Sequence, residues 1–181
     1  MTTKKKDKIA GEIRSDLFSS DEAIVLRAIH RCRDEGNATL VEPLIAFYAS
    51  DGNVDMKKEV GEMLSTLKVS NVEQYFLDAL KNPDMKHIRR DIIMFMWSSD
   101  LRPVENLSQI TSIALEGNLE ETLECLTLLE SLEMPVPEEI ILENITLIKQ
   151  NNNSNASPAV KNLIHTYLGV LENMRFQSDM D

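Results

Sequence analysis

Glycine, proline and aromatic residues are scarce in this chain. It has six glycines, six prolines and 5% aromatic residues, whereas leucine, isoleucine, glutamate and methionine are abundant. Sheets favour β-branched and aromatic residues, while the abundant residues are mostly those that favour helices. A chain that is 43% hydrophobic and 27% charged has the composition of a folded domain rather than of a disordered segment. The composition therefore predicts an all-α fold, and the length of 181 residues suits a single domain.

Long apolar runs and cysteine motifs are also missing. The longest apolar run, residues 92–97, is much shorter than the roughly 20 residues that a transmembrane helix requires. Residues 1–16 are positively charged but lack the apolar stretch of a secretory signal. The two cysteines, Cys32 and Cys125, lie far apart, as is typical of reduced structural thiols. We therefore expect a cytoplasmic protein that does not bind membranes.

The sequence contains no recognisable catalytic motif. It has no GxxxxGK[ST] phosphate loop, no GxSxG elbow and no GxGxxG fingerprint. The three histidines, His30, His87 and His165, are dispersed, and none has a cysteine or histidine at a convincing ligand spacing. His30 and Cys32 are two residues apart and point to different sides of a helix. The sequence therefore predicts no catalytic residue, no metal site and no cofactor.

Basic residues are absent from one long segment. Between Arg102 and Lys149 there is no lysine, arginine or histidine, but there are ten glutamates. Residues 1–102 carry 16 Lys/Arg against 17 Asp/Glu, and residues 103–181 carry 3 against 13. Such a surface repels nucleic acid and anionic lipid and attracts basic proteins. Two interpretations stay open, a solubilising surface and a binding face for a basic partner.

If the acidic segment binds a partner, some of its glutamates are natural candidates for the contact. The candidate partner-binding residues are Glu120, Glu121, Glu138, Glu139 and Glu143. Two pairs among them are adjacent at expected helix starts, where carboxylates complement the helix dipole. We expect both pairs to be solvated.

Two apolar positions, four residues apart, recur along the chain every 32 residues, with a last step one residue shorter. The first position is occupied by Ile24, Met56, Ile88 and Leu119, and the second by Ala28, Val60, Ile92 and Leu123. A spacing of four residues places both positions on one face of a helix. A second helix has its own recurring position, at Leu40, Val72, Val104 and Val136. We predict that all these positions are buried.

The recurrence divides the chain into four units of two helices, approximately 21–52, 53–84, 85–117 and 118–150. Turn residues fall between the helices at 35–37, 50–53, 82–84 and 116–118. Helix pairs that cannot bury an apolar face alone stack into a continuous core. Apolar stripes also predict helices over 4–18 and 158–174, which we expect to cap the two ends. The pattern favours one repeat domain spanning 1–181, a short α-solenoid.

The stretch NVDMKKEVGEML (53–64) resembles the first helix of a HEAT repeat, of the short type found in phycobilisome lyases and many bacterial scaffolds. That pattern has an acid or asparagine, an apolar residue, a basic residue, a small residue and leucine. MKHIRRDIIMFM (85–96) matches less closely, because Met85 takes the acidic position and Ile92 the small one. The resemblance covers about residues 20–150. It implies a short right-handed α-solenoid of about four HEAT-like helix pairs with capping helices, and no particular activity.

Three functions fit a HEAT-like solenoid. We favour a non-enzymatic protein–protein interaction scaffold or adaptor, because solenoids present extended binding surfaces. The first alternative is a lyase-like enzyme or enzyme subunit that acts on a chromophore-bearing or other partner protein. The second is nucleic-acid binding, as in HEAT-like alkylpurine DNA glycosylases, through basic residues in the middle of the chain: Lys57, Lys58, Lys86, Arg89 and Arg90. The acidic half of the chain disfavours it. Metalloenzymes of the deoxyhypusine hydroxylase kind are excluded, because no histidine here is followed by glutamate.

Overall fold

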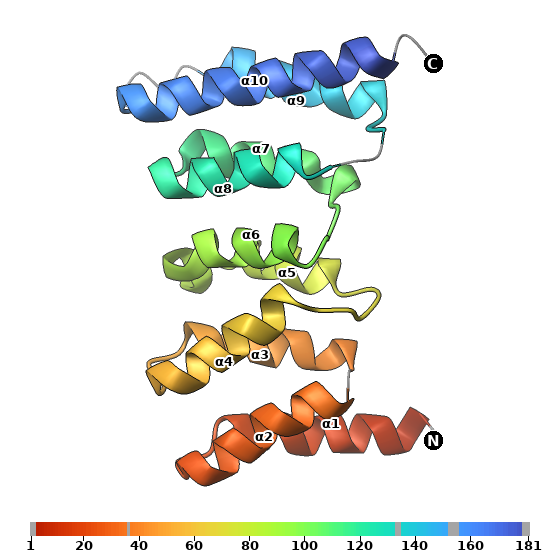
Figure 1. Cartoon of the computed structure of the whole chain (residues 1–181), viewed down its shortest axis with the longest axis vertical. Helices are drawn as coiled ribbons and strands as arrows, with labels where there is room; N and C mark the ends of the chain where they lie inside the picture. Colours follow the sequence, from red (N-terminus) through yellow and green to blue (C-terminus); the bar gives the residue numbers. More distant parts are fainter. Residues whose placement is uncertain (1–2, 36, 133–134, 152–155, 179–181) are drawn as a thin grey trace. The chain divides into compact units, whose positions relative to one another are not determined.

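The computed structural model describes residues 3–35, 37–132, 135–151 and 156–178, and within them the chain forms ten α-helices and no strand (Figure 1). The predicted all-α class is therefore confirmed. The chain falls into two compact units, unit 1 (Met1–Ser99) and unit 2 (Asp100–Asp181), which are described separately.

Unit 1 is built from helix pairs in two layers. Its helices are α1 (Thr3–Leu17), α2 (Glu22–Glu35), α3 (Val41–Ala49), α4 (Val54–Ser65), α5 (Glu73–Lys81) and α6 (Arg89–Ser98), with 3₁₀ helices η1 (Ala38–Leu40) and η2 (Pro83–Ile88). α1 packs on α2, α3 on α4 and α5 on α6. Within the layers, α3 contacts α1 and α5, and α4 contacts α2 and α6 (Figure 1).

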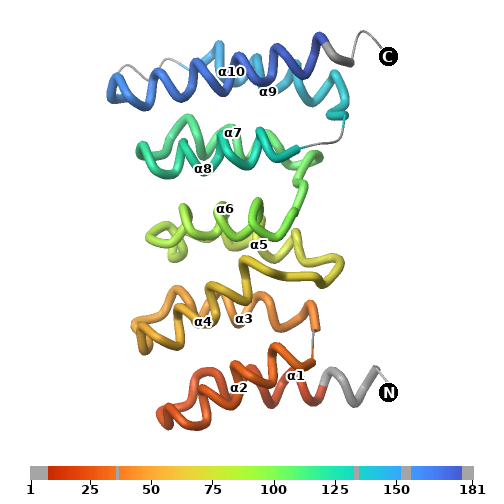
Figure 2. The backbone as a smooth tube through the Cα atoms, in the orientation of Figure 1, coloured from red at the N-terminus to blue at the C-terminus, as the bar shows by residue number. Residues whose placement is uncertain are grey.

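Unit 2 repeats this arrangement with four α-helices in its described residues. They are α7 (Leu107–Glu116), α8 (Leu119–Glu130), α9 (Glu138–Gln150) and α10 (Pro158–Ser178), preceded by the 3₁₀ helix η3 (Val104–Asn106). α7 contacts α8 and α9, and α10 contacts the same two helices. α7 and α9 thus form one layer and α8 and α10 the other, as the backbone trace also shows (Figure 2).

The two terminal helices lie close to where the sequence predicts them. α1 covers nearly all of the predicted span 4–18, and α10 contains the whole predicted span 158–174. Each packs on its sequence neighbour as one half of a pair, α1 on α2 and α10 on α9. The division into four units at 21–52, 53–84, 85–117 and 118–150 stays a prediction.

Asparagine side chains begin several of the helices. Asn37, Asn53, Asn82 and Asn118 lie at the N-caps of η1, α4, η2 and α8, and each side-chain oxygen accepts a hydrogen bond from a backbone N–H of the first turn. Such caps satisfy donors that a helix start leaves without partners. The turn signals at 35–37, 50–53, 82–84 and 116–118 therefore mark the start of the next element.

Most of the recurring apolar positions lie in the core. Ala28, Val60 and Ile92 are each 0% exposed, and Ile88 is 6% exposed, while Ile24 and Met56 are half-buried. In the second helical register, every predicted residue is buried: Leu40, Val72, Val104 and Val136. The register prediction therefore holds for the first three units, with two positions less deeply buried than expected.

The register prediction is wrong for α8. Leu119 and Leu123 are 46% and 48% exposed, whereas Thr122 and Cys125 are completely buried. The recurring row continues from Ile92 to Cys125, so the last step is 33 residues rather than 31. Two residues correspond to a rotation of about 200° around a helix, which turns the predicted leucine row away from the core.

Truncation of the core at Ile92 should be costly. Replacing Ile92 with alanine should lower the free energy of unfolding by about 2–5 kcal/mol, because the side chain is completely buried and leaves a cavity. Leu123→Ala is the matched control and should change stability little, because Leu123 is about half exposed. Urea unfolding followed by circular dichroism measures both. A similar loss in the two variants would mean that the burial of α8 is misassigned.

A tight turn between α7 and α8 requires glycine at position 117. A Cβ atom on Gly117 would lie 2.7 Å from the Ile113 carbonyl oxygen and 2.9 Å from the Glu121 Cβ. Its φ of −76° is open to any residue, so the constraint is space and not backbone conformation. At position 169 in α10, by contrast, a Cβ atom added to Gly169 would meet no other atom within 4 Å.

We predict opposite effects for alanine at these two glycines. Gly117→Ala should destabilise the protein by about 1–3 kcal/mol, because a backbone carbonyl cannot move aside. Gly169→Ala should stabilise it by about 0.5–1 kcal/mol, because alanine is the better helix former. Thermal and urea unfolding of both variants tests the pair, and a stabilising Gly117→Ala change would contradict the packing of this turn.

Candidate interaction surfaces

The described residues hold no group of three or more histidine, cysteine, aspartate or glutamate side chains that could bind a metal ion. The His87 ring lies 2.9 Å from the Ala49 carbonyl oxygen and 3.0 Å from that of Asp84, so it joins η2 to the end of α3. His30 lies 3.4 Å from Glu59, and His165 is exposed on α10. Each of the two rings of unit 1 thus contacts groups of its own.

Both cysteine thiols are buried in helices. Cys32 is 5% exposed and Cys125 is 0% exposed. Burial raises the pKa of the Cys32 thiol to about 12, only partly opposed by the nearby Arg31 guanidinium. The thiol is therefore protonated at neutral pH, which is the unreactive form.

Within the described ranges, none of the helices is both long enough and apolar enough to cross a membrane.

One of the basic residues suggested for nucleic-acid binding is used inside unit 1. The Lys57 ammonium donates a hydrogen bond of 2.7 Å to the Ser50 carbonyl oxygen and lies 5.7 Å from the centre of the Tyr48 ring. Nearby, Arg90 forms an ion pair of 3.1 Å with Asp91. The Lys57 contacts join α4 to the end of α3, so Lys57 serves the fold, whereas the Arg90 ion pair lies within α6.

Open grooves lie among the described residues of unit 1. A groove of about 370 Å³ lies between α3, α5 and η2, lined by residues that include Glu42, Tyr75 and Asp78. A second, of about 480 Å³, lies at the ends of α2 and α4, and a third, of about 220 Å³, lies beside Phe18 and Phe47. The two carboxylates of the first groove already have partners, since Glu42 pairs with Arg14 at 2.7 Å and Asp78 accepts a hydrogen bond from Gln74.

The negative charge of the protein is concentrated in unit 2. Unit 1 carries 15 Lys/Arg against 16 Asp/Glu, and unit 2 carries 4 against 14. The two units thus have balances of −1 and −10, which account for the total of −11. The charge boundary inferred from the sequence, after Arg102, coincides within a few residues with the boundary between the two compact units.

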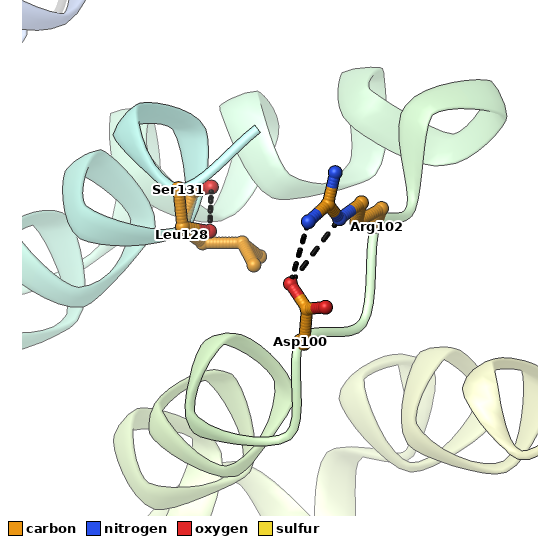
Figure 3. A network of polar contacts seen from close by, with 4 residues as sticks. All are labelled: Asp100, Arg102, Leu128 and Ser131. Atoms are coloured by element: carbon orange, nitrogen blue, oxygen red, sulfur yellow. Dashed lines mark hydrogen bonds and ion pairs between the residues drawn. The ribbon is translucent and has the colours of Figure 1, made fainter. Parts of the chain in front are cut away.

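Three of the four cations of unit 2 form ion pairs within the unit. Arg102 donates from Nε and Nη2 to one Asp100 carboxylate oxygen, at 3.2 and 2.8 Å, in the segment that leads into η3 (Figure 3). Lys149 pairs with Glu172 at 3.5 Å, and the Arg175 side chain lies 3.1 Å from Glu138. The acidic residues of unit 2 therefore exceed the cations that could neutralise them.

The structure places the five predicted partner-binding glutamates in different surroundings. Glu120 is exposed on α8, while Glu139 and Glu143 are exposed one turn apart on α9. Glu138 is exposed too, but it pairs with Arg175. Because α8 and α9 belong to different layers, the five residues do not form a single patch.

Glu121 is not solvated, contrary to the prediction for this pair. It is 6% exposed, and its carboxylate accepts a hydrogen bond of 2.9 Å from the backbone N–H of Asn118. In return the Asn118 side chain accepts from the Glu121 N–H at 3.0 Å, which completes a capping box. Glu121 therefore positions the start of α8 and is removed from the candidate binding surface.

Exposed apolar residues on unit 2 are not predicted by the apolar recurrence. Among the residues of unit 2 that the structure describes, four large apolar side chains are exposed: Leu119, Leu123, Leu142 and Phe176. The recurrence predicts burial for the two leucines of α8. The sequence signal that indicates otherwise is the N-L-E-E pattern of a capping box, Asn118 followed three residues later by Glu121, which fixes the start of the helix.

Comparisons of the chain with protein-family models, with curated proteins and with solved structures find no match.

Two buried groups, Cys32 and Tyr167, and the half-buried Tyr48 make stability dependent on alkaline pH. Burial raises the pKa of Tyr48 to about 12, helped by the Asp91 carboxylate to which its hydroxyl donates at 3.0 Å. Burial also raises the pKa of Tyr167 well above its usual value, although its hydroxyl shares a hydrogen bond of 3.1 Å with Thr111. Cys32 behaves in the same way. All three groups keep their protons in the folded protein at a pH where the unfolded chain has lost them.

The free energy of unfolding should therefore be constant up to about pH 9 and should fall as the pH rises toward about 12. Urea unfolding at a series of pH values tests this. Tyr167→Phe should flatten the decline, because it removes one of the titrating groups, at the cost of leaving the Thr111 hydroxyl without this partner. A protein equally stable from pH 8 to pH 11 would contradict the burial of these groups.

Proposed function

We propose that the protein is a non-enzymatic adaptor whose acidic unit 2 binds a basic partner protein. The observation that carries this proposal is the concentration of charge, because a balance of −10 in one compact unit produces a long-range field that a balanced unit lacks. We further propose that the helix pairs form a short right-handed α-solenoid of the HEAT-like type. The two-layer packing inside each unit supports this, because stacked helix pairs have the same pattern of contacts.

An adaptor fits the described residues better than the alternatives do. A phosphate backbone would be repelled by a chain of net charge −11, which disfavours nucleic-acid binding. A lyase-like enzyme needs a groove with convergent polar groups, and in the α3–α5 groove both carboxylates are already held by neighbouring side chains. A field that attracts basic proteins needs no such groove. The charge favours basic partners, mainly by raising the rate of association.

Glu139 and Glu143 are the best residues with which to test the proposal. Both are exposed on α9, and they lie four residues apart on one face of the helix. Glu138 is a poorer choice, because its substitution would also break the ion pair with Arg175. As a matched control, Asp34 and Glu35 are exposed at the end of α2 in unit 1. Replacing both residues of either pair with lysine changes the net charge of the protein by the same amount.

The double substitution Glu139→Lys/Glu143→Lys should slow association with a basic partner about tenfold at low salt, and less at high salt, because exposed charges are screened. Asp34→Lys/Glu35→Lys should have a much smaller effect. The partner is first captured from a native lysate of the source cells and identified by mass, and its association rate is then measured by surface plasmon resonance. Circular dichroism establishes that both variants are folded. Equal rates for the two variants and the unaltered protein, independent of salt, would mean that the acidic surface only keeps the protein soluble.

A further inference from the structure

The exposed face of α8 carries two leucines in a row. Leu119 and Leu123 are 46% and 48% exposed. They are four residues apart, so they lie on the same side of the helix, about 6 Å apart along its axis. Thr127, half-buried, is next in this row, and its hydroxyl donates back to the Leu123 carbonyl oxygen at 3.1 Å. The row therefore presents more apolar than polar surface.

These leucines contribute little to the core of unit 2. The other side of α8 holds side chains that pack inside the unit, and they are all buried: Thr122, Cys125, Leu128 and Leu129. α8 contacts α7 and α10 within unit 2. An exposed leucine row on a helix whose core-facing side is complete is the kind of surface that binds another polypeptide.

The surroundings of the row indicate what chemistry its partner has. Glu116, Glu120 and Glu130 are exposed on α8 or next to its start, and unit 2 as a whole is strongly acidic. A second copy of the chain would bring the same acidic residues and be repelled, as would an anionic lipid surface. A basic polypeptide is the occupant that matches both the apolar row and the charge.

The partner segment should be helical. The residues that the structure describes contain no strand, so they offer no sheet edge to which a partner strand could add. Two leucines one helical turn apart match apolar residues spaced three or four apart on an amphipathic helix. We propose that the face of α8 formed by Leu119 and Leu123 docks a basic amphipathic helix of the partner protein. This inference rests on the proposed adaptor function and assigns its contact surface.

A pair of synthetic peptides tests the inference. Both are about 14 residues long, or four helical turns. They have the same composition and contain only leucine, lysine and alanine. One has its leucines on a single helix face, and the other has them distributed around the helix. Binding of each labelled peptide to the full chain is measured by fluorescence anisotropy at about 0.05 M and about 0.15 M salt.

The amphipathic peptide should bind the unaltered protein at least about tenfold more tightly than the peptide with distributed leucines. Only the amphipathic peptide buries both leucines of α8. Leu119→Ser/Leu123→Ser should abolish this difference. Leu142→Ser should keep it, because Leu142 is exposed in the same unit but on α9. Leu123→Lys provides a second variant, which should weaken binding of the amphipathic peptide through repulsion. Thermal unfolding establishes that each variant is folded.

The outcomes separate this inference from the proposed function. If the unaltered protein binds both peptides equally, and more weakly at higher salt, the acidic charge attracts basic chains and the leucine row is not a docking face. If Leu142→Ser abolishes the difference and the α8 variants keep it, the contact lies on α9 and the inference is wrong. If neither peptide binds even at low salt, the proposed attraction of basic partners fails together with the inference.

Discussion

The capping box at the start of α8 determines which of its side chains are buried. Asn118 and Glu121 exchange hydrogen bonds of 2.9 and 3.0 Å, and the close approach of Gly117 to Ile113 leaves no room for another residue. Once the first turn is fixed, the rotation of the whole helix follows, because each residue advances by about 100°. Thr122 and Cys125 then face the core, while Leu119 and Leu123 face solvent. The proposed docking face is thus a consequence of the cap.

Much of the fold follows from local patterns in the sequence. α1 and α10 could be located because apolar stripes with helical spacing identify amphipathic helices independently of tertiary contacts. The deep burial of Ala28, Val60 and Ile92 could be predicted because each of these helices has one clearly apolar side. α8 has leucines on more than one side, so apolar spacing alone does not decide which row is buried. The capping box, a polar interaction, determines which row is buried. A pattern of apolar residues contains no information about such an interaction.

The acidic character of unit 2 was predictable, but the role of each acid was not. Net charge is additive along the chain and needs no structure. Whether a given carboxylate is free depends on residues distant in sequence, such as Arg175, which lies 37 positions after its partner Glu138. The segment between Arg102 and Lys149 has no basic residue of its own, and the partner of Glu138 comes from α10, outside that segment. Glu121 shows the converse, because its carboxylate accepts a hydrogen bond from the backbone at the start of its own helix.

Charge and apolar contact act over different distances, and in the proposed binding mode each selects for a different property. Exposed charges act over about 8 Å at physiological ionic strength, whereas leucines bind only within about 4 Å. The acidic surface therefore selects basic chains before contact, and the leucine row retains those with apolar residues at helical spacing. Unit 1 also exposes apolar side chains, including Val54 and Phe18, but its charge is nearly balanced. A partner approaching unit 1 would not be sorted by charge, so unit 2 is where both selections operate on the same polypeptide.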